Sequence, residues 1–93
     1  MPGVFINPER LRSFAEKLNN FSESVHELTN QLSLSTQGLG ESWQDEGFEA
    51  FQEGVEKAKE SLLRLSEEAK QVVPKLRQDA EAVEKYQKIN FKG

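Results

Sequence analysis

Apolar residues recur at alternating intervals of three and four along two stretches of this 93-residue chain. The first stretch has them at Leu11, Phe14, Leu18, Phe21, Val25, Leu28 and Leu32. The second stretch has them at Phe48, Phe51, Val55, Ala58, Leu62, Leu65, Ala69, Val72 and Leu76. This spacing puts apolar side chains along one stripe of an α-helix that packs lengthwise against another helix. The pattern therefore predicts an all-α fold of two long amphipathic helices.

The first predicted helix begins at a capping signal and ends at a glycine. Asn7 can accept hydrogen bonds from free backbone amides, and Pro8 suits the first helical position. Gly38 suits a C-terminal cap, because glycine adopts positive φ without a steric penalty. We therefore expect a helix over about 8–37 and a bend over 38–44 that contains both Gly38 and Gly40.

The second predicted helix covers about 45–88. Ser42 and Asp45 are both suitable N-terminal caps for it, and the sequence does not distinguish between them. Pro74 lies inside this helix. Because proline removes one backbone hydrogen bond of a helix, we expect a kink there.

Folding at the bend aligns the two apolar patterns as an antiparallel helical hairpin, which makes residues 1–93 a single domain. In this alignment Phe21 faces Leu65 and Val25 faces Leu62. Bulky residues often face small ones elsewhere in the alignment, as interdigitating layers require. The expected hairpin core consists of Leu11, Phe14, Leu18, Phe21, Val25, Leu28, Leu32, Phe48, Phe51, Val55, Leu62, Leu65, Val72 and Leu76.

A hairpin of only two helices leaves apolar surface without a partner. Leu34 and Leu63 lie outside the core pattern and form a candidate partner surface. Such surface favours the docking of a second hairpin, which gives a four-helix bundle. We expect a homodimer first, because identical two-fold pairing is the commonest arrangement. A heterodimer with a related small helical chain is the second expectation.

The composition narrows the classes of function. The chain has 12 basic and 16 acidic residues, a formal net charge of -4 and no basic block. Binding to nucleic acid or to an anionic membrane surface is therefore not expected. No run approaches the ~18 apolar residues of a membrane span, and MPGVFINPER lacks the basic and apolar regions of a general secretory signal. The expected location is cytoplasmic, with export that needs no cleaved signal peptide as the alternative.

Neither catalysis nor metal binding is expected from the side chains present. The chain has no cysteine, so thiolate metal sites, thiol nucleophiles and disulfides are excluded. His26 is the only histidine, and it follows Glu23 at the i, i+3 spacing that di-iron bundles use. Those sites need this motif from two helices together with two further glutamates, whereas one chain has the motif once. We therefore expect no metal, no cofactor and no enzymatic activity.

The middle of the chain resembles a known family. Leu39 precedes the only tryptophan, Trp43, and Phe51 follows that tryptophan by eight residues. In a helical hairpin of this size, the arrangement resembles the WXG family of ESAT-like proteins, in which a Trp-x-Gly motif occupies the bend. The resemblance implies a substrate or partner of a type VII secretion system. From the residues alone, Trp43 is either a plug over the end of the hairpin core or part of a partner surface.

Two positions depart from the family pattern. Asp45 stands where the motif has glycine, and the resulting Trp-Gln-Asp resembles divergent members of the family. Tyr86 and Asn90 match the family's C-terminal export signal, Tyr-x-x-x-Asp/Glu, except that asparagine lacks the carboxylate charge. We therefore expect a non-enzymatic protein-interaction module of the WXG type. The alternative is a cytoplasmic structural or adaptor four-helix bundle with no secretion role.

Overall fold

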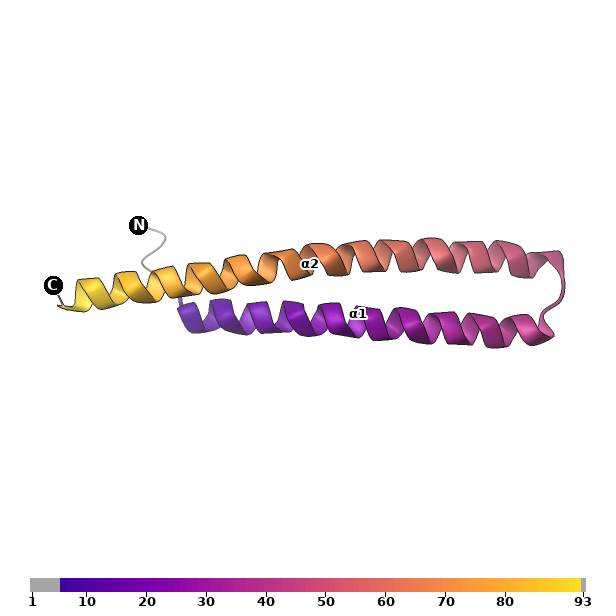
Figure 1. Cartoon of the computed structure of the whole chain (residues 1–93), viewed down its shortest axis with the longest axis horizontal. Helices are drawn as coiled ribbons and strands as arrows, with labels where there is room; N and C mark the ends of the chain where they lie inside the picture. Colours follow the sequence, from indigo (N-terminus) through magenta and orange to yellow (C-terminus); the bar gives the residue numbers. More distant parts are fainter. Residues whose placement is uncertain (1–5, 93) are drawn as a thin grey trace.

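A computed structural model of the chain describes the backbone of residues 6–92 and the side chains of residues 6–89. Two helices, α1 (Pro8–Ser42) and α2 (Glu46–Lys92), lie side by side and run in opposite directions (Figure 1). Together they make an elongated hairpin with extents of 73 × 18 × 15 Å. The all-α helical hairpin that the apolar pattern predicted is thereby confirmed.

The start of α1 lies at the predicted capping signal. Asn7 has extended backbone angles, with φ of -92° and ψ of 116°. Its side-chain oxygen accepts hydrogen bonds from the backbone N–H of Glu9 at 2.8 Å and from that of Arg10 at 3.4 Å. Pro8 takes the first helical position, where an N–H group would have no partner within the helix. The chemistry of neighbouring residues therefore sets this helix boundary.

The bend is shorter than predicted and lies further along the chain. Helix α1 continues through Gly38 and Gly40, neither of which has a positive φ, so the prediction that Gly38 caps the helix is wrong. The chain instead reverses over residues 43–45. Gly40 is closely packed, because a Cβ built on it would lie 2.8 Å from Cζ of Phe48 and the ring would have to shift. The glycine leaves the space that the ring of Phe48 occupies.

Small side chains make the contact between the two helices. Buried positions recur every seven residues, at Ala15, Ser22, Thr29 and Thr36 on α1 and at Ser66, Val73 and Ala80 on α2, and Val25 is buried as well. A spacing of seven residues is about two helical turns, so each set forms a strip along one side of its helix. We call these two strips the contact rows. Their small size lets the two helices approach closely.

The contact rows correct the predicted hairpin core. Of its fourteen residues, only Val25 is buried and seven are half-buried, namely Leu11, Leu18, Leu32, Phe48, Val55, Leu62 and Leu76. The other six are exposed, namely Phe14, Phe21, Leu28, Phe51, Leu65 and Val72. The physical reason is that one helix covers only a narrow stripe of its neighbour, and the apolar pattern is wider than that stripe. The covered stripe is centred on the small residues beside the pattern.

Hydrogen bonds satisfy the buried hydroxyl groups of the contact rows. The hydroxyl oxygens of Ser22 and Ser66 are 2.7 Å apart, and Ser66 also donates to the backbone carbonyl of Ser22 at 3.2 Å. Thr29 and Thr36 each donate to a backbone carbonyl one turn earlier in α1. Among the residues whose side chains are described, no buried side-chain nitrogen or oxygen lacks a hydrogen-bond partner. The hydroxyl groups of the contact rows therefore cost little when they are buried.

The Ser22–Ser66 contact also fixes the alignment of the helices. It lies one residue along from the predicted pair of Phe21 and Leu65. In antiparallel helices this difference shifts the lengthwise alignment by about two residues, roughly 3 Å, from the predicted one. Each helix is also turned so that the neighbouring row faces inward.

Helix α2 remains one helix through Pro74 and curves gently along its length, so the kink expected there does not divide it (Figure 1). Beyond this proline it still packs on α1, because Ala80 is fully buried and Glu84 forms an ion pair with Arg12.

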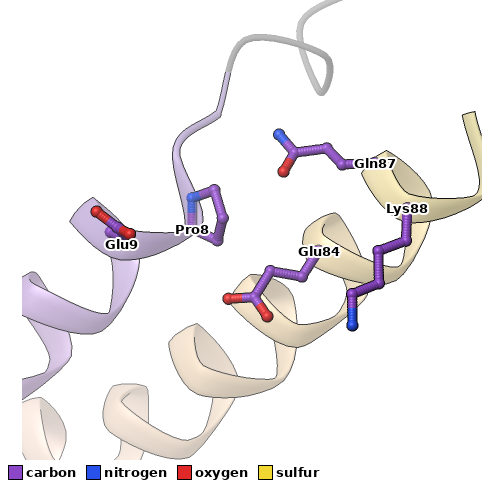
Figure 2. Close-up of a pocket in the computed structure, with 5 residues that line it drawn as sticks. All are labelled: Pro8, Glu9, Glu84, Gln87 and Lys88. Atoms are coloured by element: carbon purple, nitrogen blue, oxygen red, sulfur yellow. The ribbon is translucent and has the colours of Figure 1, made fainter. Parts of the chain in front are cut away.

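A groove at the open end of the hairpin is lined by Pro8, Glu9, Glu84, Gln87 and Lys88. Figure 2 shows the side chain of Glu84 pointing from α2 toward α1.

Candidate functional site: the apolar face and the hairpin tip

The six exposed residues of the predicted core form one surface, which we call the apolar face: Phe14, Phe21 and Leu28 on α1 and Phe51, Leu65 and Val72 on α2. Most of them come directly before a residue of the contact row, as Phe21 comes before Ser22 and Leu65 before Ser66. One residue is about 100° around a helix. The same offset on two antiparallel helices puts both sets on the same side of the hairpin. The half-buried leucines and valines lie between them.

The opposite side of the hairpin is polar. A groove there is lined by Arg12, Glu16, Asn19, Asn20, Arg77 and Glu81. Lys59 of α2 extends its stem across this side, donates a hydrogen bond to the hydroxyl of Ser33 and pairs with Glu56. The hairpin thus has one apolar and one polar side, which is the distribution expected when only one side meets another protein.

The tip of the hairpin holds three aromatic rings in contact, which we call the tip cluster. Trp43 packs edge-on against Phe48 with 5.5 Å between ring centroids, and it packs at a tilt against Phe51 at 5.3 Å. Trp43 is half-buried, and Phe51 is 39% exposed. The tryptophan therefore covers the end of the hairpin, as one interpretation of the sequence expected, and it also remains in part accessible at the surface.

Asp45 is the N-terminal cap of α2, which settles the choice between Ser42 and Asp45. Its Oδ1 accepts a hydrogen bond from the backbone N–H of Gly47 at 2.8 Å. The same oxygen accepts a second hydrogen bond, from the indole Nε1 of Trp43 at 2.6 Å. Ser42 instead donates to the backbone carbonyl of Leu39 in the last turn of α1. One carboxylate therefore joins the bend tryptophan to the start of the second helix.

Folding separates charges that are mixed in the sequence. None of the 12 lysines and arginines lies between residues 18 and 56. We call residues 32–56 the acidic end, which carries a net charge of -6 from Glu41, Asp45, Glu46, Glu49, Glu53 and Glu56. We call residues 6–17 and 71–92 the basic end, where eight basic and five acidic residues leave a net charge of +3. These ends are the two extremities of the rod (Figure 1).

The other residues singled out in the sequence do not join this surface as a group. Leu34 is 69% exposed but lies about 120° around α1 from Leu28 of the apolar face. Leu63 is half-buried on α2. Tyr86 is 51% exposed on α2. The side chain of Asn90 lies outside the described residues.

Among the described residues, no group of three or more His, Asp or Glu side chains is placed to hold a metal ion. His26 and Glu23 are exposed on α1. A search of the same part of the chain for a helix with the length and apolar character to cross a membrane finds none.

The contact rows are what sequence reasoning missed. Their signal was present as small residues at intervals of seven, Ala15-Ser22-Thr29-Thr36, each one position after the row that begins with Phe14. Serine and threonine count as polar in an apolar pattern, so the row did not stand out. The division of the apolar pattern into an inner part and an exposed face follows once this row is placed between the helices.

A comparison with family models matches residues 4–87 to WXG100, described as proteins of 100 residues with WXG. The matched region includes both helices up to the groove at the open end and the bend with Trp43. A comparison with curated proteins and one with solved structures find no match.

Proposed function

The chain belongs to the WXG100 family, and from this membership we propose that it is a non-enzymatic protein-interaction module that serves a type VII secretion system as a substrate or partner. The family includes substrates of such systems. The observation that carries the proposal is the apolar face, because two packed helices leave six large apolar side chains exposed on one side. Exposed apolar surface of this kind marks a site of protein contact.

A second copy of the same chain is the partner that we propose for this face. Two hairpins that pack through their apolar faces bury these side chains in the centre of a four-helix bundle. A two-fold axis brings the apolar face of one subunit against the apolar face of the other, so the same surface is buried in both subunits. A related helical chain with a similar face is the alternative partner.

The charge distribution supports an antiparallel arrangement of the two hairpins. In that arrangement the acidic end of one subunit, with a charge of -6, lies beside the basic end of the other, with a charge of +3. A parallel arrangement would place the two acidic ends together. Complementary charges favour the correct orientation and disfavour the wrong one.

One sequence feature favours the alternative function, a structural or adaptor bundle without a secretion role. The position that would carry the carboxylate of the export signal holds Asn90, four residues after Tyr86. If the secretion machinery reads the charge, this chain is not exported alone. It then acts as the partner of an exported chain or as a bundle that stays in the cell.

The homodimer is tested by the mass of the purified chain, measured by light scattering. We expect twice 10.6 kDa for the unaltered protein. Phe21→Asp and Leu65→Asp each place a charge in the centre of the apolar face, so both variants should shift to the monomer mass, with helix content measured by circular dichroism to confirm folding. A wild-type mass of 10.6 kDa would contradict self-pairing and direct the search to a related chain.

Leu34→Asp is the matched control, because Leu34 is at least as exposed as the apolar-face residues but lies away from them. This variant should remain a dimer. If Leu34→Asp dissociates the dimer and Phe21→Asp does not, the partner surface is the one first predicted around Leu34, and the apolar face is not the interface.

The secretion role is tested separately, in the bacterium that encodes the chain. Culture medium and cells are probed for the protein together with a cytoplasmic lysis marker. Accumulation in the medium without the marker, and its loss when the type VII ATPase is deleted, supports the proposed role. Retention in the cell, even when the other substrates of the system are exported, would favour the adaptor function.

A further inference from the structure

The side chain of Asp45 accepts hydrogen bonds from two groups, one in the backbone of α2 and one in the ring of Trp43. Its Oδ1 is 2.8 Å from the backbone nitrogen of Gly47 and 2.6 Å from Nε1 of Trp43. Its backbone carbonyl accepts from the N–H of Phe48 at 3.2 Å, which closes the first turn of α2. Capping explains the contact with Gly47. It does not explain the second contact, because a shorter capping residue would satisfy Gly47 without reaching the indole.

The surroundings of Trp43 are shaped to keep the ring against the start of α2. A Cβ built on Gly47 would lie 3.4 Å from Cζ2 of Trp43 and 3.0 Å from Oδ1 of Asp45, so this glycine leaves room for both groups. Phe48 and Phe51 support the other parts of the ring, at 5.5 and 5.3 Å between centroids. The indole therefore has apolar support from two rings and one polar anchor, which is Asp45.

We propose that Asp45 is a positioning residue for Trp43: its carboxylate holds the indole N–H and fixes the ring as a preformed part of the hairpin tip. A glycine, which the family motif has at this position, has no side chain that could accept this hydrogen bond. In this chain the indole N–H already donates a hydrogen bond to Asp45. A partner that docks at the tip therefore meets the edge and face of the ring and not its hydrogen-bond donor.

This inference deepens the proposed function, since it treats the tip as a contact surface, but its geometry is independent of dimer formation. Fixing the ring before a partner arrives lowers the entropy cost of binding. Five further carboxylates lie at the same end of the rod, at Glu41, Glu46, Glu49, Glu53 and Glu56, and of these Glu53 and Glu56 are paired with Lys57 and Lys59. The complementary chemistry of a docking group is thus apolar or cationic.

The experiment uses the indole N–H signal in proton–nitrogen NMR spectra of the full-length chain. The chain has a single tryptophan, so one indole signal reports on one ring. Asp45→Ser keeps a good N-terminal cap but is too short to reach the indole. We expect this variant to keep its helix content and to show roughly tenfold faster solvent exchange of the indole N–H, as loss of a charge-assisted hydrogen bond implies. The indole signal should also move upfield.

Asp45→Asn supplies the matched control. Its amide oxygen can accept from both Gly47 and Trp43 without the charge, so the indole exchange should be slower than in Asp45→Ser and closer to that of the unaltered chain. Asp45→Gly should behave as Asp45→Ser does at the indole. If the indole signal and its exchange are the same in the unaltered chain, Asp45→Ser and Asp45→Gly, then Asp45 is only a helix cap and the inference is wrong. The mass of each variant, measured alongside, shows whether the dimer persists and so keeps this result separate from the test of the homodimer.

Discussion

Glycines at four positions of this hairpin have different surroundings, although all four lie in helices. A Cβ built on Gly38 or Gly54 meets no atom within 4 Å, whereas one built on Gly40 lies 2.8 Å from the ring of Phe48. None has a positive φ, so backbone conformation does not require glycine at any of them. Side-chain space alone distinguishes these positions.

This difference predicts opposite consequences for two alanine substitutions that are two residues apart. Gly38→Ala should stabilise the protein by about 0.5–1 kcal/mol, because alanine loses less conformational entropy in a helix. Gly40→Ala gains the same helix preference but must displace the ring of Phe48, and overpacking costs about 1–3 kcal/mol. We expect Gly40→Ala to be the less stable variant by at least about 1 kcal/mol in urea unfolding. Equal stabilities would mean that the ring moves freely and that the tip cluster is loosely packed.

At the scale of the helices, the contact rows determine how α1 and α2 associate. Ser22 is 2% exposed and Ser66 is 0% exposed, and their hydroxyl groups bond to each other. A buried hydroxyl that loses its partner costs about 1–3 kcal/mol, whereas removal of both partners is nearly neutral. The pair therefore favours the one alignment in which the two serines meet.

The serine pair predicts a non-additive pair of substitutions. Ser66→Ala should destabilise the hairpin by about 1–2 kcal/mol, because it leaves the hydroxyl of Ser22 without its partner on α2. Adding Ser22→Ala should cost little more, so the double variant is expected to be more stable than the sum of the single changes implies. Chemical unfolding of the three variants measures this coupling. Additive losses would show that the two hydroxyl groups do not depend on each other.

The two helices, their antiparallel order and their approximate alignment could be predicted from the sequence, whereas the surface that each helix buries could not. Spacing identified the apolar residues, and Asn7 with Pro8 identified the start of α1. Spacing alone does not say which of two neighbouring stripes the second helix covers. That choice depends on how closely the backbones approach, which the small residues at Ala15 and Ser22 permit. The same limit applies at the bend, where the second hydrogen bond of Asp45 depends on the three-dimensional position of the indole.

At the scale of the whole molecule, the separated charges predict how salt affects the dimer. An antiparallel pair places unlike charges side by side, so sodium chloride should weaken it, and the dissociation constant should rise severalfold between low salt and about 0.5 M. A parallel pair brings the two acidic ends together, and salt would then strengthen it. Sedimentation equilibrium at several salt concentrations distinguishes the two orientations by the sign of the change.

The elongated shape of the hairpin affects how the number of subunits can be measured by gel filtration. The radius of gyration of a single hairpin is 20.9 Å. A compact chain of this length would have a radius of gyration of roughly 12 Å, and a compact protein reaches the observed value only at about 370 residues. On a gel-filtration column calibrated with globular standards, a lone hairpin would therefore elute early and pass for an assembly of several chains. The elution volume alone would therefore give too large a number of subunits, because it depends on the shape of the rod as well as on its mass.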